Sequence, residues 1–204
     1  MIKEQNILLY KFYCHEIDIL NDIESCRELM ALFLTTTTRD VLDILLHDFH
    51  SWQIQCSDIP QYSNFDVAIL RVPQILVVKE DGVDFVQMGF MLDSATKKTG
   101  ANMKYGENHA KTASLLALSS IVNSKVYPSL LAKEWNVLSD KQKKVVLPKL
   151  CLYCKLFQNY YALGANEEIL IKLMSCLSES TLKRRKSNCI QIISKIDTAM
   201  TNEF

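Results

Sequence analysis

The chain has 204 residues, 49% of them hydrophobic, with only five glycines and four prolines. This composition is typical of a globular protein and excludes a disordered tail or a fibrous repeat. The length allows one large domain or two small ones around a buried core. No stretch has the roughly 18 consecutive apolar residues of a membrane span, and Glu4-Gln5-Asn6 stands where a signal peptide would be basic. We therefore expect a cytoplasmic protein with no membrane partner.

Formal net charge is zero, but the charges are distributed unevenly along the chain. Residues 1–96 contain six basic and fifteen acidic side chains, whereas residues 97–204 contain seventeen basic and eight acidic ones. A basic half suits a polyanion such as nucleic acid, because each neutralised phosphate releases counterions. An acidic half suits a protein partner or solvent. The alternative is that the two halves simply attract each other within one fold.

The first 80 residues predict an acidic, helical interaction region. Apolar residues recur at helical spacing over residues 7–20 and 21–34, and a third helix is expected over residues 39–52 with Thr38 as its N-cap. Two short β-branched runs follow, at residues 67–70 and 75–78, and predict two strands or one strand and a buried connector. Phe12, Tyr13, Leu32, Phe33 and Leu34 carry more apolar surface than this small region could cover, so we expect a partner protein to bury some of it.

Residues 81–204 predict a basic module with the element order of a winged helix. A helix over residues 83–96 is expected to close at Lys97-Lys98-Thr99-Gly100, followed by a second helix over residues 103–118. Residues 121–128 predict a hairpin around an Asn-Ser-Lys turn. A long helix over residues 140–163, kinked or begun at Pro148, and a last helix from about Ser180 complete the chain. The expected fold class is mainly α, with a helical N-terminal region, a winged-helix module, C-terminal helices and a few short strands.

Three segments carry a resemblance to a known module. They are residues 108–118 (Asn-His-Ala-Lys-Thr-Ala-Ser-Leu-Leu-Ala-Leu), residues 129–135 (Ser-Leu-Leu-Ala-Lys-Glu-Trp) and Ser180-Thr181-Leu182-Lys183-Arg184-Arg185. Together they resemble the winged-helix DNA-binding module associated with bacterial type II restriction endonucleases and related phage-defence proteins, over about residues 83–200. Two family glycines fall on Ala117 and Ala132, and the family's tyrosine pair falls on Asn108-His109. The resemblance implies DNA contact and no catalytic activity.

The candidate DNA-binding residues lie in three places. Lys104, Asn108, Lys111 and Ser114 share one face of the second helix, where Asn pairs with adenine and Lys with guanine or phosphate. Lys125 lies at the hairpin turn. Lys183, Arg184, Arg185 and Lys186 crowd the first turns of the last helix, where they oppose its dipole unless an anion is present. The alternatives are a merely solvated face and pairing of the arginines with Glu167, Glu168 or Glu179.

Catalytic and metal chemistry have weak support in the sequence. A restriction-type nuclease needs carboxylates and a lysine on adjacent strands, and the nearest arrangement, Asp66 followed by Val77-Val78-Lys79, lacks its second acidic ligand. Cys151 and Cys154 have zinc-like spacing without a second pair, and His47, His50 and Cys56 form only a suggestive cluster. We expect neither metal nor cofactor, and mostly buried, reduced cysteines.

The sequence thus favours a non-catalytic DNA-binding accessory subunit of a bacterial restriction or anti-phage or anti-plasmid defence complex. Its expected partners are double-stranded DNA and a catalytic or ATPase subunit that docks on the acidic region. One alternative is an architectural winged-helix subunit that bridges an SMC-type ATPase and a nuclease through protein contacts. A second alternative is a degenerate restriction endonuclease.

Overall fold

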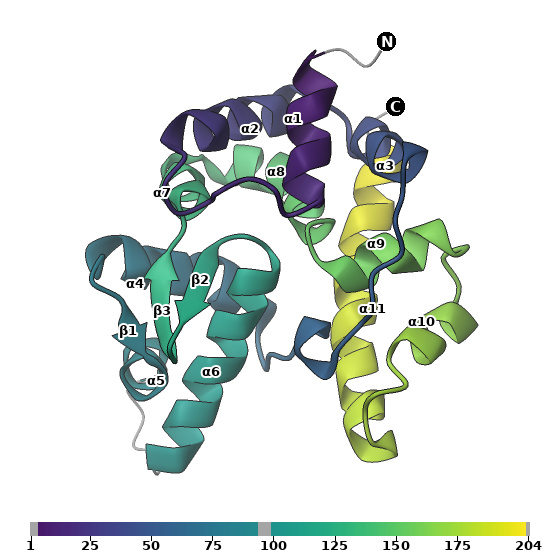
Figure 1. Ribbon diagram of the computed structural model, residues 1–204. Coiled ribbons are helices and arrows are strands. Elements are labelled where there is room, and N and C mark those ends of the chain that lie inside the picture. The colour runs from purple at the N-terminus through teal and green to yellow at the C-terminus, as the bar shows by residue number, and fades with distance from the viewer. Residues whose placement is uncertain (1–3, 94–98, 203–204) are drawn as a thin grey trace.

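The computed structural model describes residues 4–93 and 99–202, and over these ranges the chain is mainly helical (Figure 1). The helices of the first part are α1 (Glu4–Tyr13), α2 (Ile23–Thr35), α3 (Thr38–His47), the 3-10 helix η1 (Cys56–Asp58), the π-helical turn η2 (Val67–Arg71) and α4 (Val72–Val78). Next come β1 (Val83–Asp84), α5 (Phe85–Leu92), α6 (Thr99–Leu115), β2 (Ser119–Val122) and β3 (Lys125–Pro128). The last part contains α7 (Leu130–Val137), α8 (Asp140–Cys151), α9 (Lys155–Ala162), α10 (Glu167–Leu173) and α11 (Glu179–Asn202).

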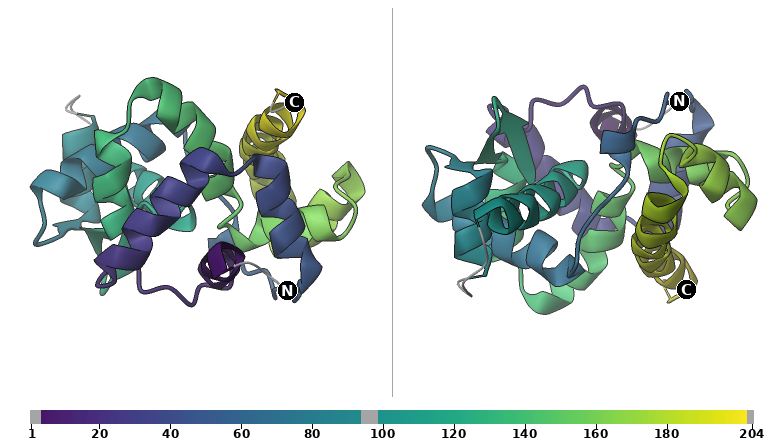
Figure 2. Two further views of the ribbon diagram at one scale, coloured as in Figure 1. Left: turned by 90° about the horizontal axis from the view of Figure 1, so that it is seen from above. Right: turned by 90° about the horizontal axis from the view of Figure 1, so that it is seen from below.

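The sheet joins segments far apart in the chain. Its strand order is β1-β3-β2 and both pairings are antiparallel, with Val83 opposite Val126. The predicted hairpin is confirmed: β2 and β3 are joined by Asn123 and Ser124, both at positive φ, as the tight turns of right-twisted hairpins require. The helices α4, α5 and α6 surround this sheet at one end of the molecule, and α10 and α11 lie at the other end (Figures 1 and 2).

The helices α5 and α6 cross at very short range because each contributes a glycine to the crossing. A Cβ on Gly89 would lie 2.0 Å from the carbonyl oxygen of Asn102, and a Cβ on Gly106 would lie 2.1 Å from that of Phe85. These neighbours are backbone atoms, which no side-chain rotation can move. The two glycines therefore fix how α6 is placed against α5.

The expected strands at residues 67–70 and 75–78 are wrong, because both segments are helical, in η2 and α4. Short runs of buried apolar residues do not distinguish a strand from a buried helix. Pro73 stands in the first turn of α4, where it needs no hydrogen-bond partner for its nitrogen. Val72 and Leu76 are fully buried, so both side chains pack in the hydrophobic core of this helical segment.

Several expected boundaries also differ. The helix expected over residues 83–96 is preceded by β1 and ends at Leu92, and Gly100 lies inside α6 and not in a closing turn. Lys97 and Lys98 lie outside the described residues. The N-cap of α3 is Thr37, one residue before the expected Thr38, since its hydroxyl accepts from the Asp40 amide.

The long helix expected over residues 140–163 is two helices. Pro148 lies within α8, which continues past it to Cys151, and the chain turns before α9 begins at Lys155. The residue before α9, Cys154, has an extended conformation that no continuous helix permits. The final helix is confirmed and begins at Glu179, one residue before the expected start.

The chain itself buries most of the large apolar residues of the N-terminal helices, so the premise that this small region cannot cover them is wrong. Phe12 and Phe33 are fully buried and Tyr13 is 2% exposed. The Tyr13 hydroxyl donates to the carbonyl oxygen of Lys149 at 3.0 Å. The buried apolar residues form one cluster that includes side chains from both sides of residue 80.

A buried lysine joins α8 to the end of α2. Lys149 is fully buried, and its Nζ donates to the carbonyl oxygens of Phe33 (2.7 Å) and Val145 (3.1 Å). Phe33 lies in the last turn of α2, where carbonyl oxygens lack helical partners and attract a cation. None of the described helices combines the length and the apolar character needed to cross a membrane.

Candidate nucleic-acid interface

The outward face of α6 lines a pocket shared with α11. Lys104, Asn108 and Lys111 stand three or four residues apart, so they share one helix face, and all three line a pocket of about 230 Å³. Arg185 of α11 and Gln61 line it from the other side. The structure thus brings together four of the predicted DNA-binding residues. They belong to α6 and α11, which are far apart in sequence (Figure 1).

A carboxylate sits in the middle of this face. Glu107 accepts hydrogen bonds from Lys104 (2.9 Å) and Lys111 (2.6 Å), and its side chain is only 16% exposed. Burial alone would raise the pKa of Glu107, but the hydrogen bonds from the two lysines outweigh burial and lower it. Glu107 therefore stays ionised near neutral pH and holds both ammonium groups toward the helix. Our sequence reasoning left Glu107 among the polar residues of this face and did not foresee that it joins the two lysines.

Arg185 is turned toward the backbone of the segment that contains η1. Its Nη1 donates to the carbonyl oxygens of Cys56 (2.8 Å) and Ile59 (3.3 Å), and its Nη2 donates to Gln61. Its Nε is buried and has no hydrogen-bond partner among the described residues. Burial, with a smaller effect of the neighbouring Arg184, lowers the pKa of Arg185, although a guanidinium remains charged in proteins. The site therefore contains a guanidinium whose buried Nε–H lacks a hydrogen-bond acceptor among the described residues.

The other basic residues of α11 face elsewhere. Lys183 and Lys186 line a different pocket, with Ile190, and Lys186 forms an ion pair with Glu167. Arg184 is exposed. Lys183 and Lys186 therefore do not line the pocket that Lys104, Lys111 and Arg185 share.

The two remaining candidates also lie apart from the shared pocket. Ser114 lines a separate pocket with Asp18 and Lys155, and Lys125 is exposed at the start of β3. Lys125 pairs in the sheet register with Val122 and with Asp84. It therefore stands at the turn end of the hairpin, as expected.

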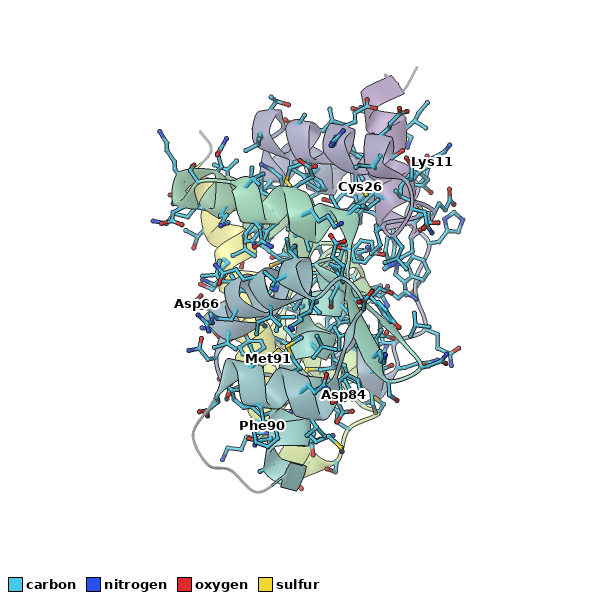
Figure 3. The ribbon with its side chains drawn as sticks, turned by 90° about the vertical axis from the view of Figure 1, so that its left-hand side faces the viewer. Lys11, Cys26, Asp66, Asp84, Phe90 and Met91 are labelled. Atoms are coloured by element: carbon cyan, nitrogen blue, oxygen red, sulfur yellow. The ribbon has the colours of Figure 1, made fainter. Side chains whose placement is uncertain are left out.

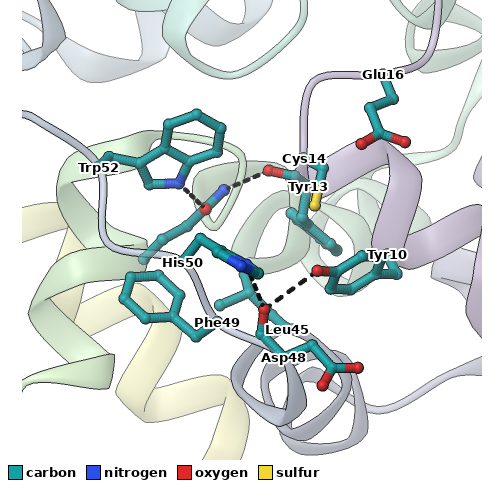
Figure 4. A pocket seen from close by; sticks show the side chains of 10 residues that line it. Tyr10, Tyr13, Cys14, Glu16, Leu45, Asp48, Phe49, His50 and Trp52 are labelled. Atoms are coloured by element: carbon teal, nitrogen blue, oxygen red, sulfur yellow. Dashed lines mark hydrogen bonds between the residues drawn. The ribbon is translucent and has the colours of Figure 1, made fainter.

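A second pocket, of about 290 Å³, is rich in aromatic rings (Figure 4). Tyr10, Phe49 and Trp52 line it, and the Trp52 Nε1 donates to Gln158 at 2.6 Å. The carboxylates of Glu16 and Asp48 also belong to its lining. Because these negative charges repel phosphate, this pocket does not extend the candidate nucleic-acid interface.

Cys151 and Cys154 lie in the hydrophobic core. Cys151 and Cys154 are both buried, and burial raises the pKa of Cys154 to about 12, so its thiol is protonated near neutral pH. Within residues 4–93 and 99–202, no cluster of three or more His, Cys, Asp or Glu residues is arranged to hold a metal ion. His47 pairs with Asp48 at 3.0 Å.

Comparison with known proteins gives no relative. No protein-family model, curated protein or solved structure matches this chain at a significant level.

Proposed function

We propose that this chain is a non-catalytic subunit that binds duplex DNA through a winged-helix arrangement. The observation that carries the proposal is the element order α4, β1, α5, α6, β2, β3 with the sheet order β1-β3-β2, which is the order of a winged helix. In this arrangement α6 is the second helix of the pair, the one that enters the major groove in helix-turn-helix proteins. Its exposed face carries Lys104, Asn108 and Lys111.

Ala117 supports the same proposal from an independent direction. Its φ is +58°, a conformation that glycine adopts without strain, and it occupies the position where the resembled family has glycine. The Ser129 hydroxyl donates to the Ala117 carbonyl oxygen at 2.6 Å and holds the chain in this turn. Ala117 in the turn between α6 and β2 therefore has a backbone conformation that favours glycine, which supports the resemblance at this position.

Glu107 determines how strongly this face attracts phosphate. With both lysines bound to one carboxylate, the face has a net charge of only about one positive unit. We expect Glu107→Gln to increase DNA affinity and to steepen its salt dependence, because the substitution frees two ammonium groups for phosphate contacts. An unchanged affinity would mean that DNA does not reach this face.

The direct test is fluorescence anisotropy of a labelled duplex at several salt concentrations. Lys111→Ala should weaken binding to all sequences and reduce the salt slope by about one. Lys144→Ala is the matched control, since Lys144 is an exposed lysine on α8, outside the proposed interface. Asn108→Ala should change the preferred sequence more than the overall affinity. Equal losses for Lys111→Ala and Lys144→Ala would contradict the assignment of α6.

A second candidate, an architectural subunit that contacts protein, is favoured by the outer surface of α5. Phe90 and Met91 are consecutive residues of α5, are 45% and 38% exposed, and are labelled in Figure 3. Exposed large apolar residues of this kind are common at protein interfaces. Salt-insensitive association with a protein partner, lost on Phe90→Ser and retained on Lys111→Ala, would favour this candidate.

The proposal extends to partners: the chain acts as a subunit of a defence complex. It is supported by the acidic first half of the chain, whose charge is unsuited to DNA and suited to a protein partner. Co-purification of the full chain with an ATPase or nuclease from its own operon would test it. Purification of the chain alone, with full DNA affinity, would argue for an independent DNA-binding protein.

A further inference from the structure

Two exposed cysteines meet at the back of the candidate interface. Cys56 opens η1, and Cys176 lies in the turn between α10 and α11, 120 residues later in the chain. The Cys56 Sγ donates to the Cys176 carbonyl oxygen at 3.0 Å. The thiol of one residue is therefore in contact with the backbone of the other.

These are the two exposed cysteines of the chain. Cys26, Cys151, Cys154 and Cys189 are buried, and Cys14 is half-buried. Cys176 is exposed as a residue, but partial desolvation of its thiol and the hydrogen bond with Cys56 raise its pKa to about 11. A raised pKa disfavours the Cys176 thiolate, so we assign the first attack on the oxidant to Cys56.

We propose that Cys56 and Cys176 form a site of reversible oxidation, closing to a disulfide when the protein meets a hydroperoxide. The Cys56 thiolate attacks a peroxide oxygen; an S–O bond forms, the O–O bond breaks, and hydroxide leaves and is protonated to water. The Cys176 thiolate then attacks the sulfenic sulfur; the S–S bond forms, the S–O bond breaks and a second water leaves. The two thiols lose two electrons and two protons, and one hydrogen peroxide becomes two waters.

The disulfide ties the wall of the candidate interface to the start of α11. The Cys56 carbonyl oxygen accepts a hydrogen bond from Arg185, and both residues line the same pocket as Lys104 and Lys111. With residue 56 tethered, this carbonyl is held against Arg185, and the guanidinium is kept from phosphate. Oxidation therefore weakens DNA binding, a consequence that rests on the proposed function.

The test is treatment of the full chain with one equivalent of hydrogen peroxide, followed by non-reducing peptide mapping. The expected product is a single cross-linked peptide pair that joins residues 56 and 176, with the mass of two hydrogens lost and restored by dithiothreitol. Cys176→Ser should abolish it, and Cys14→Ser should leave it unchanged. A sulfenic acid that persists on a single cysteine without any cross-link, or a cross-link between other cysteines, would overturn the proposal.

A parallel measurement separates this inference from the function. Reduced and oxidised wild-type protein are compared for duplex binding by anisotropy, with Cys176→Ser carried through the same oxidation. We expect a loss of affinity on oxidation in the wild type and none in Cys176→Ser. An oxidised protein that binds DNA as tightly as the reduced one would contradict the inference that the disulfide keeps Arg185 from phosphate. A cross-link in a protein that never binds DNA would leave the disulfide established and would contradict the proposed function.

Discussion

Gly106 offers the sharpest test of how α6 is positioned. A Cβ at this position would lie 2.1 Å from the carbonyl oxygen of Phe85 and 2.6 Å from the amide nitrogen of Gly89. Ordinary contact begins at 3.4 Å, so Gly106→Ala must separate α5 and α6 locally by more than an ångström. Both obstructing atoms belong to the backbone of a helix, which resists such movement.

The expected change in the free energy of unfolding of Gly106→Ala is the difference between two opposing contributions. Alanine gains about 1 kcal/mol over glycine in a helix interior. Overpacking a close crossing costs about 1–3 kcal/mol or more, and the shortness of these contacts places this cost at the upper end. We expect a net loss of about 2 kcal/mol in the free energy of unfolding, equivalent to about 4–8 °C in the melting temperature.

Urea denaturation followed by far-UV circular dichroism measures this loss. Gly100→Ala is the matched control, since Gly100 lies on the same helix and a Cβ there meets nothing within 4 Å. It should be neutral or slightly stabilising. A Gly106→Ala protein as stable as Gly100→Ala would refute the close crossing and, with it, the placement of the DNA-facing residues of α6.

Three further predictions concern stability. Burial, and to a smaller extent Lys155, lowers the pKa of His15 from 6.5 to about 4. The unfolded chain therefore binds the extra proton below about pH 6.5, and stability is lost as the pH falls from there toward 4, by about 2 kcal/mol between pH 7.5 and 5. Urea titrations over this range should show a flatter profile for His15→Asn, which also tolerates the positive φ, and an identical profile would contradict the assignment. Ala117→Gly should stabilise the protein by up to about 1 kcal/mol in thermal unfolding, because the φ of +58° strains alanine, whereas a loss would show that this strain is negligible. Lys149→Met should lower the free energy of unfolding by about 1–3 kcal/mol in urea denaturation, because the buried Phe33 carbonyl oxygen loses its donor. Equal stability would show that the cost of burying the ammonium charge cancels the benefit of this hydrogen bond.

The sequence by itself determined the helical character of the chain and its hairpin. Helical periodicity is a local property, so it located most helices, and Asn123 and Ser124 identified the turn because few residues tolerate positive φ. The same reasoning placed Lys104, Asn108 and Lys111 on one helix face, because their spacing alone fixes it. It also identified Cys151 and Cys154 as core residues.

Other features depend on contacts between distant segments and were decided only by the tertiary structure. The segment over residues 67–78 became helical because its apolar residues are enclosed, which a short run of Val and Ile does not reveal. Arg185 turned onto the Cys56 carbonyl oxygen, 129 residues away, while Lys183 was left on another face. Gly106 matters because the α5 backbone lies against it, whereas Gly100, which looked like a helix terminator, faces open space. Local spacing fixes which side chains share a face, but only packing determines what that face meets.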